Sequence, residues 1–356
     1  MRSAPYLTYV QRMIFRQLFD SQSSTYTYLI AEKTGGEALI IDPVLDRLDH
    51  YLRLLRELDI RLVKAVDTHI HADHVTALGA LRDTTHCITV MGEMSSADVV
   101  SVRVAEGDTI TAGKVSLDVL YTPGHTDCSY SFVMPDRVFT GDTLLIRGTG
   151  RTDFQNGDSR AQYHSIFDKL LRLPDETLVY PAHDYKGDTV STIGEERAFN
   201  PRLQVENEDE YVEIMAALDL PNPKQMDVAV PRNRAIGFHS DDPWLAGRSL
   251  DVDACRDLLG DGQTVFVDLR EPGEQVRHGT IAGALDVPYG ELGAAVEDDR
   301  LAAHKADAGK RLLLFCAHGE RSALALQDLR DHGLGEARHM TGGLAEWRSR
   351  GGPVSH

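Results

Sequence analysis

The sequence places three histidines and an aspartate within six residues, at His69, His71, Asp73 and His74. They follow an apolar run, residues 62–66, that has the composition of a buried β-strand. In an extended backbone His69 and His71 point the same way, so two imidazole nitrogens can face one cation, while Asp73 and His74 turn toward a second position. The spacing therefore predicts a metal site rather than a loop of solvated histidines.

Three further candidate ligands each stand a few residues after a predicted strand. His125 lies in Thr-Pro-Gly-His, Asp142 in Thr-Gly-Asp and His183 in Pro-Ala-His-Asp. In α/β sheets the strand ends open onto a shared crevice, so residues far apart in the sequence can converge there. We expect these side chains to join the first cluster.

A second reactive pattern is formed by Cys316 and Arg321, which have C-x4-R spacing. The cysteine follows a buried-strand run, residues 311–315, and precedes a predicted helix over residues 321–330. Backbone N–H groups and the positive end of the helix dipole favour a thiolate there and can hold an anion. Cysteine phosphatases use C-x5-R, so this tighter loop suits one transferred sulfur better than a phosphate. An inert buried thiol is the alternative.

The elements that must position these residues alternate between short apolar strands and helical patterns. Up to about residue 181 we expect strands near residues 25–30, 37–41, 62–66, 88–91, 115–121, 130–133, 138–140 and 177–180, and helices near 46–58, 74–82 and 159–171. A second α/β pattern begins near residue 244, after a polar stretch. We therefore predict a first domain over residues 1–237, a linker over 238–244 and a second domain over 245–356.

Composition limits the function classes. The 356 residues suffice for two domains with cores of their own, and the net charge of −18 argues against nucleic acid and anionic membranes as partners. The four cysteines lack CxxC spacing, which is typical of free thiols in a reducing compartment. Arg2, Arg12 and Arg16 stand in an N-terminal stretch without acids, as in transit peptides, but the chain runs directly into a first strand, so we expect a soluble cytoplasmic protein.

The ligand order resembles the metallo-β-lactamase superfold over about residues 7–237, which implies an αββα sandwich. Seven ligand positions with Asp142 bridging would suit a dinuclear-zinc thioesterase of the glyoxalase II type. However, residues 144–155, 15–19 and 181–185 resemble the persulfide dioxygenases, a related branch. That resemblance implies one Fe(II) per chain, held by His69, His125 and Asp142, and oxidation of glutathione persulfide by O₂ to sulfite and glutathione. A second metal near Asp73, His74 and His183 stays open.

The same resemblance implies a site for the anionic glutathione moiety. We expect Arg151 and Tyr185 to contact it, with Arg147 behind them, because each lies beside a loop that carries a ligand. For the two arginines the alternative is an ordinary ion pair. A homodimer is also expected from the resemblance.

Residues 245–353 resemble a single α/β rhodanese domain. The resemblance is carried by the motifs at residues 267–271, 279–284 and 342–347, although Thr280 stands where the family more usually has His. The resemblance implies that Cys316 accepts a sulfane sulfur from a donor such as thiosulfate and passes it to glutathione. Arg321, with Arg270, would attract the anionic donor. A sulfur-binding regulatory module without turnover is the alternative for this domain.

Overall fold

The computed structural model describes residues 13–223, 225–238, 240–298, 300–301, 310–332 and 336–356. They form two compact units. One holds the chain up to Leu81 with Val90–Ser96 and Arg103–Arg234, and the other holds Arg82–Thr89, Ala97–Val102 and Ala235–His356. The domain boundaries expected at residues 237 and 245 stay predictions. Arg2 and Arg12, considered for a transit peptide, lie outside the described residues.

The first sheet has the strand order β1-β2-β3-β4-β5-β6. Its strands are β1 (Ile14–Asp20), β2 (Thr25–Ala31), β3 (Glu37–Ile41), β4 (Arg61–Val66), β5 (Ile88–Gly92) and β6 (Val102–Val104). All seven residues of β2 are buried. The helix α1 (Leu48–Glu57) buries Tyr51, whose hydroxyl accepts the N–H of Val44 at 3.1 Å and lies 2.9 Å from Thr27 Oγ1. This polar pairing anchors α1 next to the sheet.

The second sheet has the order β14-β13-β10-β9-β8-β7, and a small hairpin, β11 and β12, follows β10 in the chain. The strands are β7 (Thr109–Ala112), β8 (Val115–Tyr121), β9 (Tyr130–Met134), β10 (Arg137–Gly141), β11 (Leu144–Leu145), β12 (Gly148–Thr149), β13 (Leu178–Pro181) and β14 (Ser191–Thr192). Along β8 buried and exposed residues alternate, as expected for a strand with one face toward a core.

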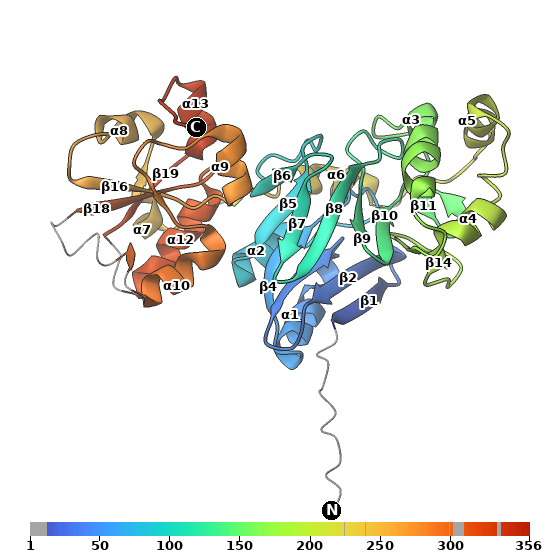
Figure 1. The fold of residues 1–356 in the computed structure, drawn as a ribbon, viewed down its shortest axis with the longest axis horizontal. Helices are drawn as coiled ribbons and strands as arrows, with labels where there is room; N and C mark the ends of the chain where they lie inside the picture. Colours follow the sequence, from blue (N-terminus) through green and yellow to red (C-terminus); the bar gives the residue numbers. More distant parts are fainter. Residues whose placement is uncertain (1–12, 224, 239, 299, 302–309, 333–335) are drawn as a thin grey trace, which may run out of the picture. The chain divides into compact units, whose positions relative to one another are not determined.

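Helices cover both sheets of this unit, with α1 and α2 (Leu78–Thr85) beside the first sheet and α3 (Ser159–His164) and α4 (Ile193–Phe199) beyond the second (Figure 1). A π-helical turn (Ser165–Lys169) and a 3₁₀ turn (Leu170–Arg172) prolong α3, and α5 (Glu208–Ala216) and α6 (Met226–Arg234) follow. One core joins Ile166 and Leu170 to Val138, Val179 and Tyr211. The layers are those of an αββα sandwich.

The helix expected at residues 74–82 begins later, at Leu78. Thr76 forms an isolated β-bridge with Val44, which keeps the preceding residues extended. The Thr76 hydroxyl then accepts the N–H of Leu78 at 3.2 Å. This tertiary pairing has no local sequence signal, and it leaves the residues after the histidine cluster in a loop.

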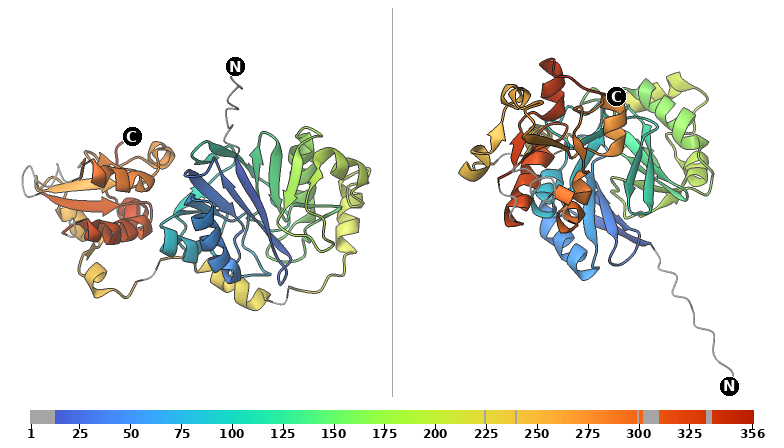
Figure 2. Two further views of the ribbon diagram at one scale, coloured as in Figure 1. Left: turned by 90° about the horizontal axis from the view of Figure 1, so that it is seen from below. Right: turned by 60° about the vertical axis from the view of Figure 1, so that its left-hand side comes forward.

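The second unit contains a parallel sheet of order β15-β19-β18-β16-β17, with helices on both faces (Figure 2). Its elements are α7 (Pro243–Ala246), β15 (Ser249–Leu250), α8 (Val252–Asp257), β16 (Thr264–Asp268), α9 (Pro272–His278), β17 (Leu285–Asp286), η4 (Tyr289–Glu291), α10 (Leu292–Glu297), β18 (Arg311–Phe315), α12 (Glu320–Asp331), β19 (Arg338–Met340) and α13 (Gly343–Ser349). Trp347 is fully buried in its core with Phe266 and Phe315. Among the described helices of the chain, none is long and apolar enough to span a bilayer.

Candidate functional site

Four strands of the first unit deliver the predicted ligands. His69 follows β4 of the first sheet, whereas His125, Asp142 and His183 follow β8, β10 and β13 of the second. All four side chains are buried and line one cavity. The convergence expected from the sequence is therefore present, at the edge where strand ends of the two sheets meet.

His69, His125 and Asp142 form one group of possible metal donors, with one ligand atom from each lying within 4.8 Å of the others. His125 Nε2 lies 3.5 Å from Asp142 Oδ2, and the rings of His69 and His125 are perpendicular with centroids 5.0 Å apart. Asp142 Oδ1 is buried and has no hydrogen-bond partner among the described residues. Two imidazoles and a carboxylate with a free oxygen form a donor set that fits a first-row transition metal.

The outer ring nitrogens of both histidines are held by the chain. His125 Nδ1 lies 2.7 Å from the carbonyl of Arg151, which can only accept, so Nδ1 carries the hydrogen and Nε2 presents a lone pair. The hydroxyl of Thr68 donates to Asp42 at 3.0 Å and therefore accepts from His69 Nδ1, also at 3.0 Å. Both tautomers suit metal binding through Nε2.

The loop after Asp142 approaches the site closely. Gly150 donates its N–H to the Asp142 carbonyl at 2.8 Å. A Cβ atom at Gly150 would lie 2.0 Å from that carbonyl oxygen and 2.9 Å from His125 Nδ1. Only glycine fits there, so this residue is needed for the packing that fixes His125 beside Asp142.

His71, Asp73 and His74 form a second group of possible donors. His71 Nδ1 and His74 Nε2 are buried without hydrogen-bond partners among the described residues. His183 Nε2 lies between the two groups, 3.5 Å from Asp73 Oδ1 and 3.7 Å from Asp142 Oδ2. The side chains that a second metal ion would need are therefore also gathered in one place.

Burial and neighbouring charge shape the protonation of this cluster. Burial, with the adjacent imidazoles, holds the pKa of His69 and of His71 well below the ordinary value, so both rings are neutral. Burial lowers the pKa of His183, but the carboxylates of Asp142 and Asp73 outweigh it and raise that pKa overall. Burial also raises the pKa of the supporting Asp42 to about 6. Neutral imidazoles are the form that binds metals.

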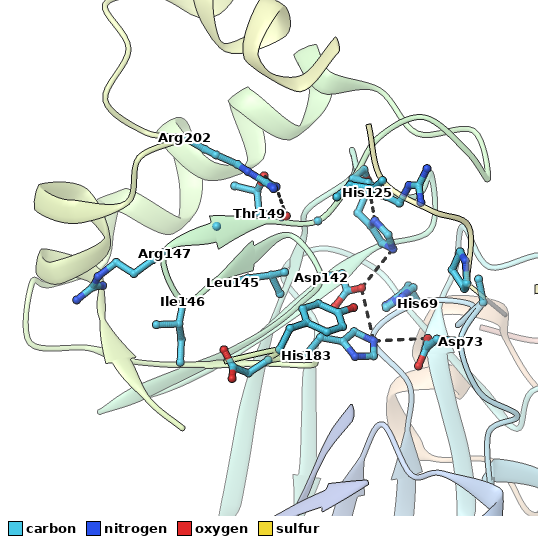
Figure 3. A pocket seen from close by; sticks show the side chains of 18 of the residues that line it. His69, Asp73, His125, Asp142, Leu145, Ile146, Arg147, Thr149, His183 and Arg202 are labelled. Carbon is cyan, nitrogen blue, oxygen red and sulfur yellow. Dashed lines mark hydrogen bonds and ion pairs between the residues drawn. The ribbon is translucent and has the colours of Figure 1, made fainter. Parts of the chain in front are cut away.

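The cavity in front of the first donor group has a volume of about 220 Å³. Figure 3 shows His69, His125, Asp142 and His183 on one side of it. Its other walls combine apolar and cationic side chains: Leu145, Ile146, Phe154, Leu220, Pro223, Arg147, Arg151, Lys186 and Arg202. Such a space suits an anionic organic molecule with one end at the donor group.

The three residues predicted to bind glutathione all line this cavity, but their surroundings differ. Arg151 donates to Asp153 at 2.6 Å and to the carbonyl of Pro221 at 2.7 Å, while Arg147 pairs with Glu195 and Glu196. Tyr185 is 72% exposed, and its ring stacks on His183 with centroids 5.9 Å apart. Two further cationic residues of this cavity were not expected from the sequence: Lys186, which directly follows the motif at residues 181–185, and Arg202, which lies in a stretch without a recognised motif.

In the second unit Cys316 lies between β18 and α12, as the sequence predicts. Its side chain is buried, and Sγ accepts the N–H of Gly319 at 3.1 Å. The Ser322 hydroxyl lies 3.9 Å from Sγ. Gly319 has φ +92°, where a Cβ atom would come within 2.9 Å of Gly342 N, so the loop needs glycine to keep its N–H on the sulfur.

The arginines near this loop are engaged by carboxylates. Arg321 is buried and donates to both oxygens of Glu274, at 2.8 and 2.7 Å. Arg270 donates to both oxygens of Asp268, and Thr280 donates to the same carboxylate at 2.6 Å. Thr280, the departure from the usual family pattern, thus takes part in a structural hydrogen bond.

The four cysteines are free and buried, as expected. Burial raises the pKa of the thiols of Cys87 and Cys255 to about 12, and it also raises the pKa of Cys128. A thiol with a raised pKa is a poor nucleophile at neutral pH. Cys316 differs from the other three in accepting a loop N–H at the start of a helix.

Two family models match the chain: the metallo-beta-lactamase superfamily over residues 21–183 and the rhodanese-like domain over residues 251–350. The proteins named persulfide dioxygenase ETHE1, mitochondrial, of Mus musculus and Homo sapiens are each 46% identical over 231 residues, which is 64% of this chain and 90% of theirs. The expected metallo-β-lactamase fold and rhodanese domain are thus confirmed.

Solved structures agree with this result. The crystal structure of ETHE1 from Myxococcus xanthus is 54% identical, covers 64% of this chain and all of its own, and has a TM-score of 0.62. A metallo-beta-lactamase from Staphylococcus aureus covers 93% of this chain and 98% of its own at 22% identity, with a TM-score of 0.59, and supports the fold alone. This chain therefore belongs to the persulfide dioxygenase family of the metallo-β-lactamase superfamily, and it carries a rhodanese-like domain in addition.

Proposed function

We propose that the first domain oxidises glutathione persulfide with O₂ to sulfite and glutathione, using one Fe(II) per chain bound by His69, His125 and Asp142. One observation carries the proposal: a ligand atom from each of these three residues lies within 4.8 Å of the other two, at the wall of a single cavity. Relatives named persulfide dioxygenase support it. When bound, such an iron supplies activation of O₂ and leaves positions for a substrate sulfur.

The overall reaction balances with one water. Glutathione persulfide, O₂ and water yield glutathione, sulfite and two protons; the S–S bond breaks, the terminal sulfur is oxidised and O₂ is reduced. Burial lowers the pKa of His69, which keeps this imidazole in the neutral form that binds metals. Arg151 and Tyr185, with Arg147, are proposed to contact the glutathione moiety.

For the second domain we propose transfer of sulfane sulfur between thiosulfate and glutathione through Cys316. The Cys316 thiolate attacks the outer sulfur of thiosulfate, sulfite leaves, and the resulting persulfide passes its sulfur to a glutathione thiolate. The N–H of Gly319, 3.1 Å from Sγ, supports the proposal because it stabilises negative charge on sulfur. This sulfur transfer would produce the glutathione persulfide that the first domain consumes.

A dinuclear-zinc thioesterase is the second candidate for the first domain. The specific observation in its favour is the second donor group, His71, Asp73 and His74, with His183 close to Asp142. It requires about two zinc ions per chain and hydrolyses thioesters without consuming O₂.

The deciding experiment combines metal analysis with an oxygen electrode. We expect protein loaded anaerobically with Fe(II) to bind one iron per chain and to consume one O₂ for each glutathione persulfide. The His125→Ala variant should lose both the iron and the O₂ uptake. Two zinc ions per chain, thioester hydrolysis and no O₂ uptake after iron loading would refute the dioxygenase proposal.

A further inference from the structure

The three arginines that line the cavity differ in whether their charge is already balanced. Arg147 forms ion pairs with Glu195 and Glu196, and Arg151 forms one with Asp153. Figure 3 shows the Arg147 side chain pointing away from His69 and Asp142. A substrate carboxylate would have to compete with these acids for either guanidinium.

Arg202 has no such partner. Its Nη1 donates to the backbone carbonyl of Thr149 and, at 3.1 Å, to the Thr149 hydroxyl, both of which are neutral. No carboxylate among the described residues pairs with it, and no hydrogen bond to its Nε or Nη2 is seen within that part of the chain. Three of the five N–H donors of the guanidinium, one on Nε and two on Nη2, thus stay available to a ligand.

The surroundings make this lone charge costly. Arg202 is partly buried, and the burial lowers its pKa, because desolvation disfavours a cation that has no anion beside it. Arg202 is also held in one position by Thr149, on the hairpin that follows Asp142 (Figure 3). A cation that is fixed, partly desolvated and unpaired at a cavity wall is arranged to receive an anion.

We infer that Arg202 binds a carboxylate of the glutathione moiety and so selects anionic, peptide-sized thiols at this site. The inference rests on the proposed substrate, but it concerns binding and does not depend on the metal or on O₂. Thr149 is a positioning residue that holds Nη1 and leaves Nε and Nη2 to the ligand. Small neutral persulfides would gain nothing from this contact.

The test is direct binding of reduced glutathione to the full chain by isothermal titration calorimetry, fitted with two sites because the second domain is also proposed to accept glutathione; the Kd compared between variants is that of the first-domain site. We expect Arg202→Gln to raise the Kd about tenfold or more, as for loss of a charge-assisted hydrogen bond. Arg202→Lys should recover part of the affinity. Arg160→Gln is the matched control, because Arg160 pairs with Glu208 and Asp209 and is not among the cavity-lining residues, and its Kd should match the wild type.

A second arm needs no variant. Glutathione diethyl ester, which lacks both carboxylates, should bind the wild-type protein at least about tenfold more weakly than glutathione. An Arg202→Gln Kd within about twofold of wild type, equal affinity for the diester, or no binding of glutathione at all would overturn the inference. Absence of O₂ uptake in every variant, with the Kd difference intact, would instead refute the dioxygenase proposal and leave the role of Arg202 standing.

Discussion

Thr68 Oγ1 lies 3.0 Å from Nδ1 of His69 and accepts its hydrogen, because the Thr68 hydroxyl already donates to Asp42. This contact fixes which nitrogen of His69 is free for a metal. Hydrogen bonds to the outer nitrogen of a ligand also hold the ring in the orientation that binding needs. Thr68 has no ligand atom of its own in the donor group, yet it determines how His69 is presented.

Replacing Thr68 by Val should therefore weaken metal binding. We expect the Fe(II) affinity, measured by competition with a chelator, to fall by about 10–100-fold. Thr68→Ser keeps the hydroxyl and should stay close to the wild type. Equal affinities for Thr68→Val and wild type would exclude this supporting role.

Gly150→Ala should disturb both stability and metal binding. The added Cβ would lie 2.0 Å from the Asp142 carbonyl oxygen, so the loop must move, at a cost of about 1–3 kcal/mol in the free energy of unfolding. Gly148→Ala is the control in the same loop, because its nearest neighbour, Leu145 Cβ, would lie 3.9 Å away. Thermal unfolding with and without Fe(II) checks both. Similar losses in the two variants would argue against a specific clash.

The two activities should separate by mutation. Cys316→Ser removes the nucleophilic sulfur and should abolish sulfur transfer while sparing O₂ uptake, whereas His125→Ala should do the reverse. Cys255→Ala, which changes a buried cysteine outside the loop, serves as a control for the loss of a thiol. Parallel assays of thiosulfate:glutathione sulfur transfer and O₂ uptake on each variant decide the matter. Loss of both activities in one folded variant would contradict two separable sites.

Arg321→Gln should destabilise the second domain, because the Glu274 carboxylate would stay buried without its guanidinium partner. The expected cost is about 3–5 kcal/mol in the free energy of unfolding, and adding Glu274→Gln should recover part of it. Denaturant unfolding followed by tryptophan fluorescence measures this domain, since both tryptophans, Trp244 and Trp347, belong to the second unit. If Arg321 serves mainly to bind the donor, the variant would instead keep its stability and show a raised KM for thiosulfate.

Acid should weaken the second domain through His339. Burial lowers its pKa to about 4, whereas the unfolded chain binds a proton near pH 6.5. Between these values the unfolded state holds more protons, so stability is complete above about pH 6.5 and falls as the pH drops toward 4, by about 3 kcal/mol in all. Tryptophan-monitored unfolding across this window should show the slope, and His339→Gln should flatten it. An unchanged slope would exclude His339 as its source; His332, an exposed histidine of the same unit, provides a control variant.

Much of the site could be predicted from the sequence. The donors His69, His125 and Asp142 each lie within a few residues of the end of a strand, and Cys316 stands between a strand and a helix, so the local order of elements places them. Because strand ends converge in an α/β fold, a site residue at such a position can be predicted from its own stretch of sequence. The start of α2 could not be read in this way, because it depends on the bridge between Thr76 and Val44.

Only the tertiary structure decided which charges are balanced. Arg147 meets Glu195 and Glu196, nearly fifty residues later, and Arg321 meets Glu274 from another helix. Arg202, which has no motif around it, reaches the cavity and finds no acid among the described residues. The sequence determines the kind of chemistry through spacing along single segments. The pairing of charges depends on side chains from distant segments meeting in space, and no local pattern encodes that.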